Sequence, residues 1–179
     1  MFIRFSQKHV PAFVVMNSLI VAVAQYLFFV ILAAAAVIWL LLPLPDKVGL
    51  AMQAVVSLAI AVVLVKLAGA VHADPRPFVV DPSIKPLFAH PADNGFPSDH
   101  TALAATVALV VMTYRKGLGA VLLAASLILG AARMVAHVHH GQDIVAGLLT
   151  AVLAVGMAAA TWRWARPRLP QRLDELASA

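Results

Sequence analysis

Long apolar runs dominate this chain and restrict what it can fold into. Crossing a hydrocarbon core of about 30 Å takes roughly 20 apolar residues, and lipid cannot hydrogen-bond the backbone, so only helices and closed barrels span a membrane. Here Ala, Val, Leu and Ile fill the runs without the strict alternation of a barrel strand. The pattern predicts membrane-spanning helices over residues 18–42, 48–71, 98–113, 118–136 and 143–163.

The predicted fold class is therefore all-α, a polytopic membrane helical bundle of about five transmembrane helices in one domain, residues 1–179. Hydrophobic residues make up 63% of the chain and charged residues 12%, which is not the balance of a water-soluble domain. Residues 1–14 mix basic and aromatic side chains and predict an interfacial helix, and residues 164–179 a cytoplasmic tail. The chain has no cysteine, which excludes disulfides and thiolate metal sites.

The connection at residues 72–97 is long for a link between two helices and holds six of the eleven prolines. Alternating crossings place it on the same side of the membrane as the short 137–142 loop. The other side carries basic residues near helix ends: Lys47, Arg115, Lys116, Arg163, Arg166, Arg168 and Arg172. The positive-inside rule therefore predicts that residues 72–97 form an extracytoplasmic loop. Because the basic residues are scattered over helix ends, a nucleic-acid partner is not expected.

One polar cluster runs from Arg133 to Asp143, between the last two predicted helices. His139 and Asp143 are four residues apart, so in a helical turn they share a face and the carboxylate accepts the ring Nδ1 proton. The free Nε2 is then a nucleophile for phosphorus, and the Arg133 guanidinium offers paired donors to phosphate oxygens. The same histidine, together with His137 and His140, also fits a zinc or copper site or an interfacial polar rim.

A second polar cluster, Pro97-Ser98-Asp99-His100, stands where the third predicted helix begins. Proline suits the first turn of a helix, serine caps it, and the free N–H groups there bind anions. His100 in its protonated form supplies a proton to a leaving oxygen. Taken alone, the pattern fits an ordinary helix cap with an incidental histidine equally well.

A third element is Arg76, which has a proline on either side and follows Lys66 by ten residues. The two prolines stiffen the backbone, so less entropy is lost when the guanidinium binds a phosphate. An interfacial arginine in a proline-rich loop is the alternative interpretation.

In this order the three segments resemble the signature of the type 2 phosphatidic acid phosphatase superfamily. That signature is a Lys followed by Arg-Pro, then Pro-Ser-Gly-His, then Ser-Arg, with a His after five residues and an Asp after three more. The resemblance covers residues 66–143 and implies a membrane phosphatase that needs no cofactor and no metal. It also implies that His139 is the nucleophile, Asp143 its partner and His100 the general acid. The implied phosphate ligands are Arg76, Ser98 and Arg133.

The chain departs from the family pattern at three positions. Ala132 stands in place of the usual serine, Asp99 in place of glycine, and Gly69 in place of the lysine expected seven residues before Arg76. Lys66 is the natural substitute, because it lies one turn deeper on nearly the same helix face and its long side chain reaches outward. His72 is nearer the loop and is the alternative phosphate ligand.

The stretch from Ala92 to His100, with the earlier Pro-Arg-Pro-Phe, resembles the bacitracin-resistance branch of the family, whose members are undecaprenyl pyrophosphate phosphatases. The resemblance implies an enzyme of the bacterial inner membrane that hydrolyses undecaprenyl pyrophosphate at the periplasmic face through a phosphohistidine. Its partners are then a polyprenyl lipid phosphate and the bilayer. Phosphatidylglycerophosphate or phosphatidate phosphatase activity, a metal-binding or transport protein, and a structural membrane subunit are the alternatives. The sequence does not indicate an oligomeric state.

Overall fold

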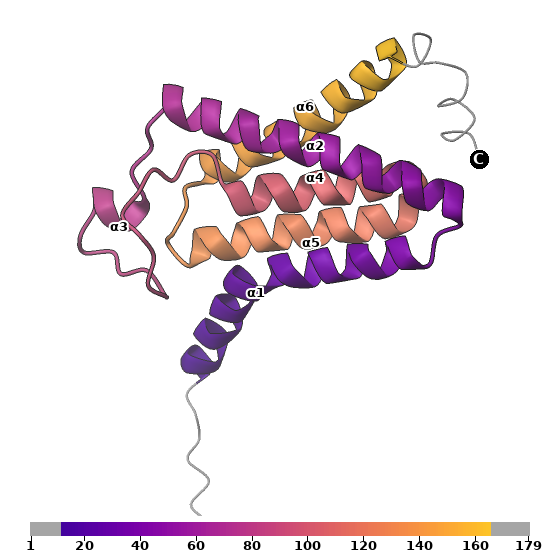
Figure 1. The fold of residues 1–179 in the computed structure, drawn as a ribbon. Coiled ribbons are helices and arrows are strands. Elements are labelled where there is room, and N and C mark those ends of the chain that lie inside the picture. Colours follow the sequence, from indigo (N-terminus) through magenta and orange to yellow (C-terminus); the bar gives the residue numbers. More distant parts are fainter. Residues whose placement is uncertain (1–11, 166–179) are drawn as a thin grey trace, which may run out of the picture.

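The computed structural model describes residues 12–165, and these residues form helices and loops without a strand. Five long helices and one short one follow each other along the chain (Figure 1). They are α1 (Ala12–Leu40), α2 (Leu44–Val71), α3 (Pro77–Val80), α4 (Asp99–Tyr114), α5 (Lys116–Val135) and α6 (Gly141–Ala165).

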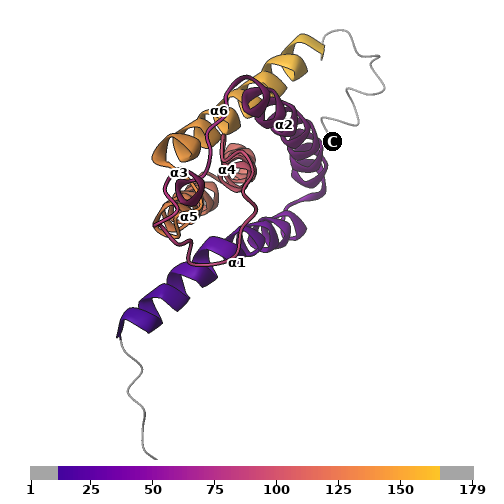
Figure 2. The same ribbon diagram turned by 90° about the vertical axis from the view of Figure 1, so that its left-hand side faces the viewer.

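Helix α4 forms the centre of the bundle. It contacts α1, α2, α5 and α6, and Figure 2, which looks along the bundle, shows it surrounded by these four helices. Small side chains on α4 make this possible, because they let neighbouring backbones approach closely. The fully buried alanines of α4 are Ala102, Ala104, Ala105 and Ala108.

The outer helices have the properties of membrane spans. Among the described residues, α1, α2, α5 and α6 are each long and apolar enough to cross a bilayer. Large apolar side chains such as Leu19, Val63 and Leu149 are more than half exposed on them, as expected for surfaces that face lipid. Helix α4 has only 16 residues and extends about 24 Å, but the other helices enclose it.

The predicted all-α membrane bundle is confirmed, with differences at the helix ends. Helix α1 begins at Ala12, so residues 12–14, which the sequence assigned to an interfacial helix, belong to α1; residues 1–11 of that segment lie outside the described residues. Helix α2 begins at Leu44, four residues before the predicted start, because Pro45 and Asp46 are accommodated in its first turn. Of the predicted tail 164–179, residues 166–179 lie outside the described part.

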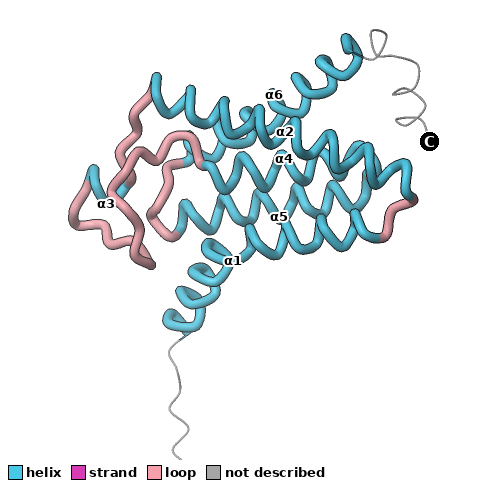
Figure 3. Tube along the Cα trace, viewed as in Figure 1, coloured by secondary structure: helices cyan, strands magenta, loops and turns pink. Residues whose placement is uncertain are grey.

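The polar segments meet at one end of the bundle. Figure 3 shows the long connection after α2, including α3, and the α5–α6 connection side by side at the end opposite the short α1–α2 turn. A backbone hydrogen bond from the N–H of Leu87 to the Ala136 carbonyl (3.1 Å) joins the two connections. A second, from the N–H of Ser98 to the Asp143 carbonyl (3.0 Å), joins the start of α4 to the first turn of α6. The three motif segments therefore lie on the same side of the bundle.

Candidate active site

The α5–α6 connection is a tight helix end that delivers His139. The N–H of Val138 donates to the Arg133 carbonyl (3.2 Å) and the N–H of His137 to the Met134 carbonyl (2.9 Å), which is the hydrogen-bond pattern of a Schellman motif. His137 takes the left-handed residue of this motif, with φ of 60°. Val138 is buried in an apolar cluster that includes Ala132, and the next residue, His139, bonds Asp143 in the first turn of α6.

His139 and Asp143 form a buried pair. Ring nitrogen Nδ1 lies 3.2 Å from Asp143 Oδ2 and donates to it, and both side chains are almost inaccessible to solvent. The same carboxylate oxygen accepts the backbone N–H of His140 at 2.8 Å. Burial lowers the pKa of His139 below its ordinary 6.5; the hydrogen bond to Asp143 raises it, and two nearby arginines lower it further. Neutral His139 is therefore favoured at neutral pH, with its proton on Nδ1 and its lone pair on Nε2.

Arg76 lies directly beside the Nε2 lone pair. Its Nη1 is 3.4 Å from His139 Nε2 and donates to the Val138 carbonyl at 2.6 Å, while Nε pairs with Asp93 at 2.8 Å. Arg76 is only 5% exposed, and the pairing carboxylate is largely exposed. Arg76 is the N-cap residue of α3 and has a proline on either side, and the two prolines restrict its backbone conformation.

The start of α4 reaches α6 closely. A Cβ atom on Gly147 of α6 would lie 2.8 Å from the Ser98 carbonyl oxygen, so the absent side chain allows the approach that joins Ser98 to Asp143. The Ser98 hydroxyl is fully buried and bonds Thr101 Oγ1 at 3.0 Å. His100 bonds Asp99 through Nδ1 at 2.8 Å, and its ring packs edge-on against Phe28 of α1.

Arg133 is buried near the end of α5 and has three different environments for its nitrogens. Nη1 donates to the Ala24 carbonyl of α1 at 3.1 Å, and Nη2 lies 3.2 Å from His90 Nε2. Nε has no hydrogen-bond partner within residues 12–165. The His90 ring in turn lies against His139, with ring centroids 6.4 Å apart. The sequence motifs did not include His90, although it was among the histidines of the long connection.

A cavity of about 380 Å³ opens beside His139. Of the predicted site residues, Lys66, Arg76 and His139 line it, while Asp143 lies behind His139. The lining does not include Ser98, His100 or Arg133, so the structure brings only part of the predicted phosphate-binding set to this cavity.

The structure also explains why the lysine of the family pattern is absent at position 69 and present at position 66. A Cβ on Gly69 would lie 3.0 Å from the Phe96 carbonyl oxygen, so a lysine there would press against the connection. Lys66, one turn earlier, is exposed and lines the cavity instead. His72, the alternative ligand, is not in the lining; its ring packs against Phe96 with centroids 4.6 Å apart.

Asn94 organises the connection and was not singled out by the sequence motifs. Its amide nitrogen donates to the carbonyls of Gly69 (2.9 Å) and His72 (3.0 Å), and its oxygen accepts the N–H groups of Asp74 (2.9 Å) and Phe96 (3.0 Å). One side chain therefore fixes the end of α2 to both sides of the connection.

The histidines after α5 do not share a single site. His137 Nδ1 lies near the Lys85 carbonyl, His139 Nδ1 bonds Asp143, and His140 Nδ1 bonds Asp74 at 3.1 Å. Within the described residues, the atoms closest to a metal-binding arrangement belong to Asp74, His140 and Asp143, within 4.8 Å of one another. That set differs from the three histidines considered from the sequence.

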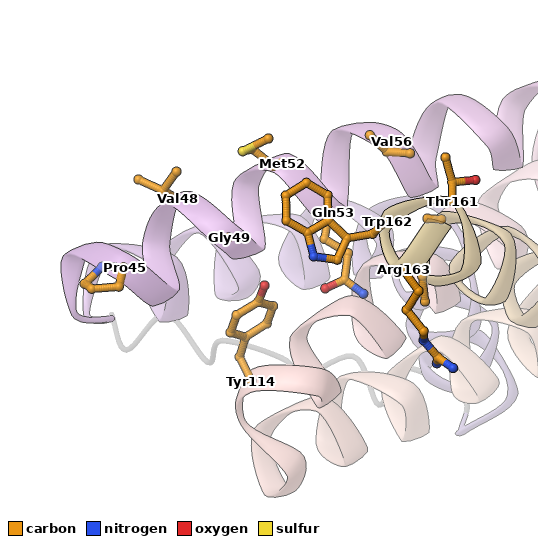
Figure 4. Close-up of a pocket in the computed structure, with 12 residues that line it drawn as sticks. Pro45, Val48, Gly49, Met52, Gln53, Val56, Tyr114, Thr161, Trp162 and Arg163 are labelled. Atoms are coloured by element: carbon orange, nitrogen blue, oxygen red, sulfur yellow. The ribbon is translucent and has the colours of Figure 1, made fainter. Parts of the chain in front are cut away.

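A second cavity of about 340 Å³ lies at the opposite end, between α2, α4 and α6 (Figure 4). Its wall is mostly apolar, and Tyr114, Gln53 and Arg163 are among the polar side chains in it. Its lining contains no histidine and no carboxylate, unlike the lining of the cavity beside His139.

Comparisons with known proteins identify relatives of this chain. The chain is 28% identical over 84% of its length to a protein of Bacillus licheniformis named bacitracin transport permease protein BcrC, of which the match covers 74%. It is 26% identical over 78% of its length to undecaprenyl-diphosphatase BcrC of Bacillus subtilis strain 168, of which the match covers 71%.

The fold is similar to that in the crystal structure of Aquifex aeolicus LpxE, with a TM-score of 0.69, 21% identity, and coverage of 86% of this chain and 88% of that one. The model of the PAP2 superfamily matches residues 50–169, which is more than half of the chain. This protein therefore belongs to the PAP2 superfamily.

Proposed function

We propose that the chain is a membrane lipid pyrophosphate phosphatase that removes the terminal phosphate of undecaprenyl pyrophosphate. The observation that carries the proposal is the buried His139–Asp143 pair, whose nucleophilic nitrogen faces Arg76 at a cavity also lined by Lys66. A neutral imidazole with a fixed tautomer beside two cations is the arrangement that attack on a phosphate requires.

In the proposed reaction, the terminal phosphate binds between Arg76 and Lys66. His139 Nε2 forms a bond to phosphorus while the bridging P–O bond breaks, and the electron pair leaves with the lipid phosphate. The proton stays on Nδ1 and is hydrogen-bonded to the Asp143 carboxylate, which stabilises the positive charge that develops on the ring. Water then attacks phosphorus and gives a proton to His100, which has lost one to the leaving oxygen. The N–P bond breaks, its electron pair returns to His139 Nε2, and inorganic phosphate leaves.

His100 has the role of general acid in this proposal. Its Nδ1 is held by Asp99, so Nε2 is the nitrogen that transfers a proton to the leaving oxygen. Ser98, Arg133 and the α4 N-terminus complete the proposed anion-binding set behind the cavity. Because the His100 ring packs against Phe28, its transfer of a proton requires the ring to turn toward the substrate.

The substrate is inferred from the relatives. The Bacillus subtilis relative is named an undecaprenyl-diphosphatase, and the other is named for bacitracin. Outward-facing apolar side chains on α1, α2 and α6 suit an isoprenoid tail that approaches through lipid. Phosphatidylglycerophosphate and phosphatidate carry similar phosphates and are the second candidate substrates.

We also propose that the site faces the periplasm of a bacterial inner membrane, in a single domain. Lys47, Arg115, Lys116 and Arg163 lie at the end of the bundle away from His139, where cytoplasmic loops carry basic residues. Modification of a single introduced cysteine in the 72–97 loop by a membrane-impermeant thiol reagent in intact cells tests this orientation.

The function is tested by phosphate release from undecaprenyl pyrophosphate, phosphatidylglycerophosphate and phosphatidate by the purified protein in detergent with chelator. The expected result is the fastest release from undecaprenyl pyrophosphate and none from His139→Ala. Substantial turnover by His139→Ala rejects the nucleophile, and equal rates on all three lipids reject the substrate assignment. Bound transition metal that disappears in His140→Ala, without turnover, favours the metal-binding alternative.

A further inference from the structure

His90 lies at the junction of the two site arginines, although the family signature in this chain does not contain it. Its Nε2 is 3.2 Å from Arg133 Nη2, and its ring lies 6.4 Å from the His139 ring, centroid to centroid. Arg76 lies 3.4 Å from His139 Nε2. His139 therefore has two neighbours, Arg76 and His90, and His90 in turn contacts Arg133.

The contacts of His90 define its proton position. Nδ1 lies 3.2 Å from the Pro91 carbonyl, which only accepts, so Nδ1 carries the proton. Nε2 then presents a lone pair, and the Arg133 guanidinium donates to it. In this arrangement His90 is a neutral acceptor that occupies a donor of Arg133, the position that a phosphate oxygen takes on an arginine.

Resting on the proposed function, we propose that His90 is a second, titratable phosphate-binding residue of this site. While the site is empty, neutral His90 holds Arg133 in place. When a phosphate binds, His90 takes up a proton from solvent, releases Arg133, and donates to the phosphate together with the arginine. Binding of the anion is therefore coupled to uptake of one proton.

The charges around His90 decide when it takes up a proton. Arg133 on α5 and Arg76 before α3 oppose protonation of the ring, Asp93 in the same connection favours it, and neutral His139 lies against it. Burial lowers the pKa of His90 below its ordinary 6.5 in the empty site, and the arginines lower it further. A bound phosphate dianion offsets the arginine charges and supplies an acceptor, so it raises that pKa.

Thermodynamic linkage between protonation and binding gives the sign and the upper limit of the pH dependence of phosphate affinity. A group whose pKa rises on binding makes binding tighter as pH falls, by at most about tenfold per pH unit for one proton, between the pKa values of the bound and free states. The effect is absent above both values, where His90 is neutral in both states. Replacement of His90 by glutamine keeps an acceptor for Arg133 and removes the titration.

The test measures binding of inorganic phosphate by calorimetry in two buffers of different ionisation enthalpy, from about pH 8 to pH 5.5. Wild type is expected to take up close to one proton more than His90→Gln, and its affinity to rise by up to about tenfold per pH unit more. Proton uptake by the phosphate and by other groups of the protein is common to both proteins and cancels in the difference. His137→Asn, which suits a left-handed backbone and leaves the site intact, is expected to behave as wild type.

Equal proton uptake by wild type and His90→Gln overturns the inference, as does the same loss of uptake in His137→Asn. If His90→Gln does not fold in detergent, His90→Asn replaces it in the same comparison. Proton uptake without phosphate release from any lipid leaves this inference standing and rejects the proposed function. Turnover of lipid substrate together with equal proton uptake by wild type and His90→Gln supports the proposed function and rejects this inference.

Discussion

Replacement of Asp143 by asparagine tests how the buried carboxylate supports His139. Carboxylate Oδ2 accepts both the His139 Nδ1–H and the His140 N–H, so two donors favour an amide oxygen at this position in the variant. The tautomer of His139 is then kept, and only the negative charge is lost. Among the described residues Oδ1 has no hydrogen-bond donor, so the new NH2 group replaces an oxygen that no donor contacts.

The magnitude follows from the kind of hydrogen bond. A bond to a charged partner contributes about 1.5–3 kcal/mol and a neutral one about 0.5–1.5 kcal/mol. Because the ring becomes positively charged as the N–P bond forms, we expect a loss of about 1.25 kcal/mol in transition-state stabilisation, or roughly 8-fold in kcat. Asp143→Ala, which frees the ring as well, is expected to lose considerably more.

The assay is steady-state phosphate release in detergent, with melting temperature as the check on folding. Asp81→Asn is the matched control, because this exposed carboxylate bonds Ser83 and lies outside the site. The acid limb of the kcat profile reports protonation of His139. Loss of Asp143, which raises the pKa of His139, is expected to move that limb to lower pH. A kcat within threefold of wild type, or equal losses for Asn and Ala, contradicts the reasoning.

Three further predictions concern the cation, the packing and the metal. Arg76→Lys is expected to lower kcat/KM about 30-fold, because one ammonium cannot replace the separate bonds to Asp93 and Val138, and kinetics across substrate concentrations measure it. Gly119→Ala is expected to destabilise the bundle by about 3 kcal/mol, since its Cβ would lie 2.3 Å from a backbone atom of α4, whereas Gly117→Ala, with open space around it, should melt at or above the wild-type temperature. Excess chelator should leave turnover unchanged; activity that is lost with chelator and restored by zinc would overturn the metal-independent reaction.

The part of the site that could be predicted from the sequence is the contact between residues that are close in the chain. His139 and Asp143 are separated by one helical turn, so their contact depends little on the rest of the fold, and the structure contains it. The helices were predictable because the bilayer requires long apolar runs. Their ends were less so, since Pro45 and Asp46 are typical both of turns and of a helix start.

Contacts that depend on the path of the long connection could not be predicted. His90 reaches Arg133 across 43 residues, and Gly69 meets Phe96 only because α2 ends against the connection. The sequence could name Lys66 as a substitute for the missing lysine but could not say why position 69 excludes a side chain. The orientation of His100 toward Phe28 likewise follows from packing between α1 and α4, which no local pattern contains.

The hydrogen bonds of Asn94 bear on the chemical durability of the protein. An asparagine followed by glycine, as here with Gly95, is a pair that cyclises and loses ammonia readily in an open chain. In the folded protein both Nδ2 hydrogens and the side-chain oxygen are engaged, and the Gly95 N–H donates to the Asp74 carbonyl at 2.9 Å. These hydrogen bonds keep the Gly95 nitrogen from attacking the side-chain amide of Asn94. Deamidation at this position would therefore identify molecules in which the connection had unfolded. An aspartate there would place a carboxylate beside the Gly69 and His72 carbonyls, and this repulsion would hinder refolding of the connection.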